Sequence, residues 1–162
     1  MNDPLGNIDL VPWGRIRHCY GPATDVPALL RALQSSDAKE REQAWWELYG
    51  NLWHQQTIYE ATPYAVPFLI HLLSDKGTPE RTKVAFYLAT LYFAETGEPN
   101  HLQSTRKAVA DGVRVYLDLL KQGEVGEKIF AAYLLGATGR WGILSDDDDL
   151  SVIEQIGKAA EQ

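Results

Sequence analysis

The sequence predicts an all-α protein built from repeated pairs of helices. Its 162 residues, 45% hydrophobic and 23% charged, suit one globular domain with a sizeable core. No stretch alternates polar and apolar residues for long enough to indicate a strand. Similar segments recur at a nearly fixed spacing, which is the signature of a repeat architecture. We therefore expect a single domain, 1–162, of stacked helix pairs.

Two separate segments of the chain show the repeat. VPALLRAL begins at Val26 and VPFLIHLL at Val66, while EREQAWWEL begins at Glu40 and ERTKVAFYL at Glu80. Both segments thus return after 40 residues in one register. Because each segment carries apolar residues at helical spacing, every copy is predicted to be two helices.

A third copy follows at a longer spacing. VRVYLDLL begins at Val113 and EKIFAAYLL at Glu127, each 47 residues after its counterpart in the second copy. The seven additional residues are assigned to a polar loop over 94–105, which contains the helix breakers glycine, proline and asparagine.

Local signals mark where the helices of the first copy begin. Asp25 is a candidate N-cap with Pro27 in the first helical turn, where a missing N–H costs little. Asp37 starts the second helix, and Glu40 three residues later resembles a capping box. The repeat divides the chain into an N-terminal cap, three repeats and a C-terminal helix: 1–23, 24–57, 58–97, 98–142 and 143–162.

The stretch HQQTIYEATPYAVPF, residues 54–68, connects the first two copies. Thr62 followed by Pro63 predicts a helix start with threonine as the N-cap, and Pro67 then lies inside that helix and should kink it. The first seven residues, HQQTIYE, either tie helix ends together or contact a partner, and the sequence leaves both readings open.

The repeat unit resembles HEAT repeats. The likeness rests on helix pairs of about 40 residues, an early proline, an acidic turn, and Arg41, Arg81 and Lys128 at one position of the second helix. It covers about residues 24–140 and implies a short right-handed α-solenoid of about three HEAT-like helix pairs with terminal capping helices. HCYGPATDVPALLRAL and HQQTIYEATPYAVPFL are similar to segments of small bacterial HEAT-like proteins, which implies a bacterial cytosolic protein and supplies no catalytic residues.

The same register places aromatic residues at one position of each second helix. In HEAT-like solenoids these helices line the concave surface, where Trp and Tyr concentrate binding energy. Phe86 and Phe93 are expected to pack between helix pairs, whereas binding is favoured for Trp46 and Trp53. The residues predicted to contact a partner are Trp46, Tyr49, Trp53, His54, Tyr59, Glu60, Phe86 and Tyr133.

Metal, cofactor and catalytic signals are weak. The four histidines show no paired metal spacing and Cys19 is the one thiol, so neither a metal site nor a cofactor is expected. Asp146 to Asp149 fit an acidic helix start better than a calcium loop. GATGRWG, residues 136–142, fits a helix end. No Ser or Cys lies in a glycine elbow, so no enzyme is expected.

Charge and hydropathy limit the partner class. The net charge is −7 without a block of Lys or Arg, which argues against nucleic acid. The longest apolar run, 84–94, is too short to span a membrane. The N-terminus lacks a secretion signal and the chain has one cysteine, so a cytoplasmic location is expected.

These observations favour a non-catalytic module that binds another protein, with a basic partner favoured by the excess of acid. A narrower hypothesis, from resemblance and charge, is an immunity protein that neutralises a toxin. Two alternatives stay open. One is a HEAT-like enzyme of the DNA glycosylase or lyase type. The other is a structural adaptor that docks through an apolar stripe at Leu150, Ile153 and Ile156.

Overall fold

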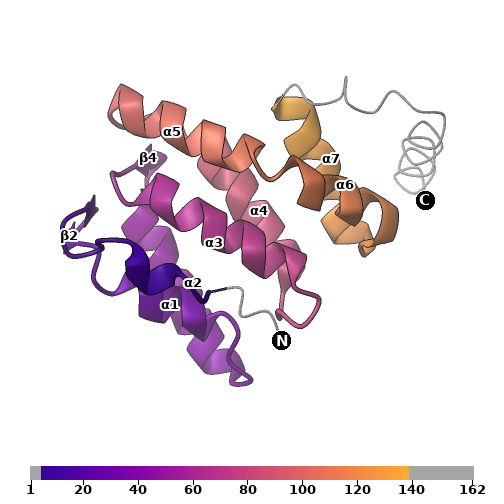
Figure 1. The fold of residues 1–162 in the computed structure, drawn as a ribbon, viewed down its shortest axis with the longest axis horizontal. Coiled ribbons are helices and arrows are strands. Elements are labelled where there is room, and N and C mark those ends of the chain that lie inside the picture. The colour runs from indigo at the N-terminus through magenta and orange to yellow at the C-terminus, as the bar shows by residue number, and fades with distance from the viewer. Residues whose placement is uncertain (1–4, 139–162) are drawn as a thin grey trace.

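The computed structural model describes residues 5–138 of the chain, and this range is mostly helical (Figure 1). The helices are α1 (Val26–Ala32), α2 (Ala38–Leu52), α3 (Thr62–Ser74), α4 (Arg81–Tyr92), α5 (Pro99–Ala110), α6 (Val113–Gln122) and α7 (Val125–Ala137), preceded by the 3-10 helix η1 (Ile8–Leu10). The predicted helical class is confirmed.

Two short antiparallel hairpins interrupt the helices. One joins β1 (Arg17–His18) to β2 (Gly21–Pro22), and the other joins β3 (Trp53–His54) to β4 (Thr57–Ile58). The expectation of no strand was wrong at these two places, because strands of two residues are too short to produce an alternating pattern.

The helices pack in consecutive pairs, α1 with α2, α3 with α4, and α6 with α7. Neighbouring pairs touch through α1 and α3, and through α4 and α7. The second helices α2 and α4 also meet, because the rings of Trp45 and Tyr87 lie 5.6 Å apart. Buried side chains from α1 to α7 form one hydrophobic cluster. No helix within residues 5–138 has both the length and the hydropathy needed to cross a membrane.

The additional residues of the third copy form a helix and not a loop. The predicted polar loop over 94–105 is wrong from Pro99 onward, since α5 begins there and packs against α3 and α4. Its proline stands at the helix start, where the missing N–H removes no intrahelical bond. Thr105 and Val109 provide the buried face of α5. Proline breaks a helix when it lies in the middle, but at position 99 it begins one.

The predicted starts of α1 and α2 are correct in position, but the predicted capping contacts are only partly present. Asp37 is the N-cap of α2 and its carboxylate accepts the Lys39 N–H at 2.9 Å. Glu40 does not complete a capping box, because it accepts a hydrogen bond from the Ser35 hydroxyl. Asp25 is the N-cap of α1, yet its carboxylate binds side chains outside that helix.

The start of α3 differs from the prediction by one residue. Ala61 is the N-cap, and Thr62 is the first helical residue. The fully buried Thr62 hydroxyl accepts the Tyr59 N–H at 3.0 Å and donates to the Leu52 carbonyl at 2.7 Å. Thr62 therefore ties the end of α2 to the start of α3 instead of capping its own helix. Pro67 lies inside α3, as predicted.

The shared basic position of the second helices links neighbouring pairs. Arg41 donates to the Ser35 carbonyl beyond the end of α1 at 2.8 Å and to the Glu80 carboxylate at 3.0 Å. Arg81 donates to the Leu73 carbonyl in α3 at 2.9 Å and lies 3.5 Å from the Glu127 carboxylate. Each arginine thus joins the two helices of its own pair and reaches the glutamate of the next pair.

Several predicted features lie outside the described residues. They are the C-terminal helix, the stripe at Leu150, Ile153 and Ile156, the acidic run Asp146 to Asp149, and most of the glycine-rich helix end.

Candidate partner-binding site

The two hairpins lie side by side at the end of α2, on the left in Figure 1. The Cys19 N–H donates to the Asn51 carbonyl at 3.0 Å, which holds the first hairpin against α2. The Ala61 N–H donates to the Arg17 carbonyl at 2.9 Å, and the Arg17 N–H donates to the Glu60 carboxylate at 3.1 Å. Backbone bonds therefore fix the position of one hairpin relative to the other.

A buried polar network supports the first hairpin. The Tyr20 N–H donates to Nδ1 of His18 at 3.0 Å, so this nitrogen carries no proton and Nε2 carries it. Nε2 then donates to the Asp25 carboxylate at 2.9 Å, and the Asn51 amide donates to the same carboxylate at 2.7 Å. His18 and Asn51 are buried. This network holds the turn that carries Tyr20, and it gives His18 a structural role.

A pocket of about 330 Å³ lies between the hairpin turns and the exposed face of α2. Trp46 and Tyr20 stand at its edge with 78% and 69% of their surface exposed. The Tyr20 ring meets the His54 ring edge to face at 6.0 Å, and its hydroxyl lies 3.5 Å from Nδ1 of His54. The lining residues are Tyr20, Trp46, Glu47, Tyr49, Gly50, Asn51, Trp53, His54 and Gln55.

Tyr49 gives the pocket a rigid wall. Its ring packs 4.4 Å from the ring of Tyr87, which is fully buried, and meets Trp53 edge to face at 6.3 Å. Burial raises the pKa of Tyr49 to about 12, so its hydroxyl is neutral at physiological pH. Tyr49 and Trp53 are therefore held in place by their packing against the hydrophobic core.

The turn of the second hairpin has positive φ at both central residues, as the favoured two-residue hairpin turn requires. Gln55 and Gln56 have φ of 50° and 68°, and neither is a glycine. A left-handed conformation costs a residue with a side chain about 1–2 kcal/mol. The hairpin geometry itself accounts for this backbone, and the position of Gln55 in the lining of the pocket is what favours partner contact for the beginning of HQQTIYE.

Tyr59 and Glu60 have a different position from the other predicted contacts. Glu60 accepts the Arg17 N–H, and the Tyr59 N–H donates to Thr62, so both residues connect the hairpins to α3. Burial and the neighbouring Cys19 thiol raise the pKa of Tyr59 to about 12. Neither residue lines the pocket. Their contacts favour the structural reading of this half of the connection.

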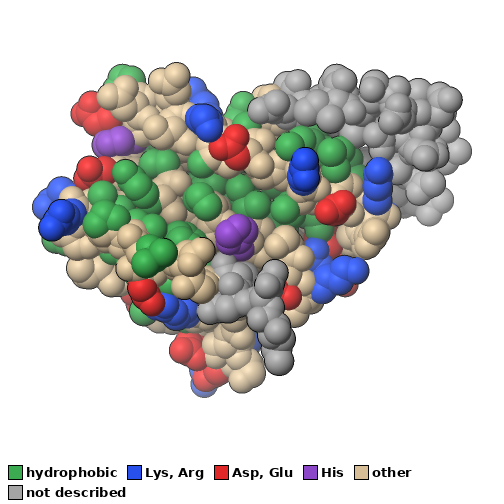
Figure 2. Space-filling view, viewed as in Figure 1, with side chains coloured by type: hydrophobic (Ala, Val, Ile, Leu, Met, Phe, Trp, Pro, Cys, Tyr) green, Lys and Arg blue, Asp and Glu red, His purple; other side chains and the backbone are tan. Residues whose placement is uncertain are grey.

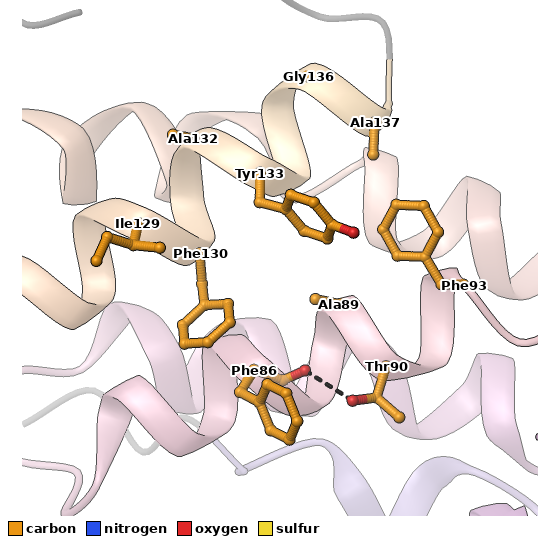
Figure 3. Close-up of a pocket in the computed structure, with 10 residues that line it drawn as sticks. All are labelled: Phe86, Ala89, Thr90, Phe93, Ile129, Phe130, Ala132, Tyr133, Gly136 and Ala137. Carbon is orange, nitrogen blue, oxygen red and sulfur yellow. Dashed lines mark hydrogen bonds between the residues drawn. The ribbon is translucent and has the colours of Figure 1, made fainter. Parts of the chain in front are cut away.

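Phe86 and Tyr133 lie elsewhere, in an apolar groove of about 900 Å³ between α4 and α7 (Figure 3). The Phe86 ring lies 5.4 Å from Phe130, and the Tyr133 ring lies 5.0 Å from Phe93. Phe86 and Tyr133 keep 46% and 56% of their surface exposed. These aromatic residues thus pack between helix pairs and line a groove at the same time.

Apart from Tyr59 and Glu60, the predicted contacts therefore divide between two places. Trp46, Tyr49, Trp53 and His54 lie together in the pocket, whereas Phe86 and Tyr133 lie in the groove. Sequence reasoning missed Tyr20 as a lining residue. The signal was its place in HCYG, a short polar and aromatic stretch just before a helix, as HQQT is before the next one.

The described part of the chain offers little for metal chemistry. Within residues 5–138, no group of three or more His, Cys, Asp or Glu side chains is placed to hold a metal ion. On the face of the molecule seen in Figure 2, Lys and Arg side chains are scattered among acidic ones, and hydrophobic side chains gather over α3. The pocket contains one carboxylate, Glu47, and no Lys or Arg.

Comparisons with protein-family models, with curated proteins and with solved structures gave no match. The resemblance to HEAT repeats therefore stays a prediction from the sequence.

Proposed function

We propose that this chain is a short right-handed α-solenoid of HEAT-like helix pairs, without catalytic activity, that binds another protein at the pocket beside α2. The pairwise packing of the helices and the repeated arginine contacts between pairs support the solenoid. The pocket supports the binding role, because it combines rigid aromatic rings with adaptable polar groups at one end of the molecule.

The single observation that carries the proposal is the position of Trp46. The neighbouring Trp45 is buried in the core, whereas Trp46 on the same rigid helix is 78% exposed. Among the described residues no other aromatic ring contacts Trp46. An exposed indole on a fixed helix gives a large binding surface at a small entropic cost, which is why tryptophan is enriched at the centres of interfaces.

The charge of the chain supports a basic partner. With a net charge of −7, long-range attraction accelerates association with a positively charged protein and disfavours acidic ones. A bacterial toxin neutralised by this chain is the narrower form of the proposal. Co-expression with a toxin encoded beside it tests that form: survival of the cells supports an immunity role, and continued killing contradicts it.

Affinity capture from the native host tests the general proposal. The bait is the full chain, its Trp46→Ala variant and a matched Tyr64→Ala control, since Tyr64 is another half-exposed aromatic residue on a different helix, α3. A partner should be retained by the wild-type chain and by the control, and it should be lost with Trp46→Ala. Circular dichroism must show that all three are equally helical. Equal retention by Trp46→Ala would refute the pocket as the binding site.

A further inference from the structure

We propose that the pocket beside α2 holds an arginine side chain of the partner protein. This inference rests on the proposed function and specifies the chemistry of that site. Its starting point is Glu47, which lies half-buried among the lining residues. The Glu47 carboxylate accepts a hydrogen bond from the Gln43 amide at 2.8 Å, and no Lys or Arg within residues 5–138 forms an ion pair with it.

Aromatic rings line the same pocket as this carboxylate. Trp46, Tyr49 and Trp53 come from α2 and its end, and Tyr20 comes from the first hairpin. The faces of such rings attract cations, and the attraction grows as water is excluded from the site. A carboxylate that lines the same pocket as several aromatic rings therefore favours a positive ligand over a negative one.

Other ligand classes fit less well. An anion would meet the Glu47 charge. A purely apolar side chain would remove water from that carboxylate without supplying a hydrogen bond, which is unfavourable. A volume of about 330 Å³ is at the small end of ligand pockets, so it suits one long side chain better than an extended cofactor.

The aromatic rings and the carboxylate in the lining favour arginine over lysine. A guanidinium is planar, stacks on aromatic rings, is weakly hydrated, and donates two parallel hydrogen bonds to a carboxylate. An ammonium group is strongly hydrated and has no flat face to place against Trp46 or Tyr20. The arginine stem would lie along the apolar part of the lining while its head meets Glu47.

Short blocked peptides test the inference directly. Three peptides of the form acetyl-Gly-X-Gly-amide carry arginine, lysine or citrulline, the last being a neutral analogue with nearly the shape of arginine. Each is titrated into the full chain labelled with ¹⁵N, and the indole N–H signals of the five tryptophans are followed. Trp46 and Trp53 should shift with the arginine peptide, while the buried Trp13 and Trp45 serve as internal references. Citrulline should bind about tenfold more weakly, and lysine should bind more weakly than arginine.

A matched pair of variants then tests the role of the carboxylate. Glu47→Gln and Glu42→Gln remove the same charge from the same helix, but Glu42 is exposed and lies outside the pocket. Glu47→Gln should weaken the arginine peptide about tenfold and Glu42→Gln less than about twofold, because only the first breaks a charge-assisted contact. Equal effects of the two variants, equal binding of citrulline or lysine, or no shift at a large excess of arginine peptide would overturn the inference.

Failure of this inference can be distinguished from failure of the proposed function. Loss of a captured partner with Trp46→Ala, but not with Glu47→Gln, would leave the binding site standing and refute the arginine. Arginine peptide binding without any partner captured through Trp46 would instead support the pocket chemistry and contradict the protein-binding function.

Discussion

The contact between Arg81 and Glu127 should stabilise the chain more than the equivalent contact between Arg41 and Glu80. We expect Glu127→Gln to lower the free energy of unfolding, because Arg81 would then be a largely buried cation without a charged partner. Glutamine keeps an acceptor for the Glu124 N–H, which Glu127 binds at 3.0 Å, so the substitution acts mainly on the charge.

Burial decides the size of the effect. The Arg81 and Glu127 side chains are 15% and 5% exposed at 3.5 Å, whereas those of Arg41 and Glu80 are 16% and 41% exposed at 3.0 Å. Opposite charges about 4 Å apart attract by about 4 kcal/mol at an effective dielectric constant of 20, and desolvation offsets much of this. We expect a coupling energy of about 1–2 kcal/mol for the buried pair and about 0.5 kcal/mol for the other.

Two double-mutant cycles measure these energies by urea denaturation followed by circular dichroism. One combines Arg81→Ala with Glu127→Gln, and the matched cycle combines Arg41→Ala with Glu80→Gln. Added salt should reduce the coupling of the exposed pair more than that of the buried pair. The reasoning is refuted if the shorter but more exposed Arg41 and Glu80 contact proves the stronger one, because distance and not burial would then decide.

Three further predictions concern the core, the strained turn and alkaline pH. Tyr87→Phe removes a buried O–H that donates to the Leu48 carbonyl at 2.8 Å, so urea denaturation should show a loss of about 1 kcal/mol; an unchanged stability would contradict this bond. Gln56→Gly should raise the unfolding free energy by about 1 kcal/mol, because φ is 68° there, and a lower melting temperature would contradict the left-handed turn. Burial raises the pKa of Tyr49 to about 12 and that of Tyr87 well above its usual value, so the folded chain keeps protons that the unfolded chain releases above about pH 10. The stabilising contribution of these two tyrosines should therefore be fully present below about pH 10 and be lost as the pH rises further. In Tyr87→Phe the urea denaturation midpoint should fall less steeply with rising pH.

The candidate site was only partly predictable from the sequence. Trp46 and Tyr49 lie in α2 and Trp53 follows its last residue, so helical spacing alone could group them with the adjacent His54. Tyr20 joins them because backbone bonds hold the first hairpin against the end of α2 and the start of α3, and such long-range bonds leave no periodic signal. Tyr59 and Glu60 connect the hairpins to α3 through hydrogen bonds to Thr62 and Arg17, and helical spacing does not predict these bonds either.

The helical class, the repeat and the helix starts at Asp25 and Asp37 follow from the sequence by itself, because periodicity and capping are local properties of the chain. Tertiary structure decided the rest. It made the residues from Pro99 a helix, since α3 and α4 offer an apolar surface to cover. It also brought Tyr20 to the rings of α2, because the backbone bond that holds the first hairpin against α2 joins residues far apart in the sequence.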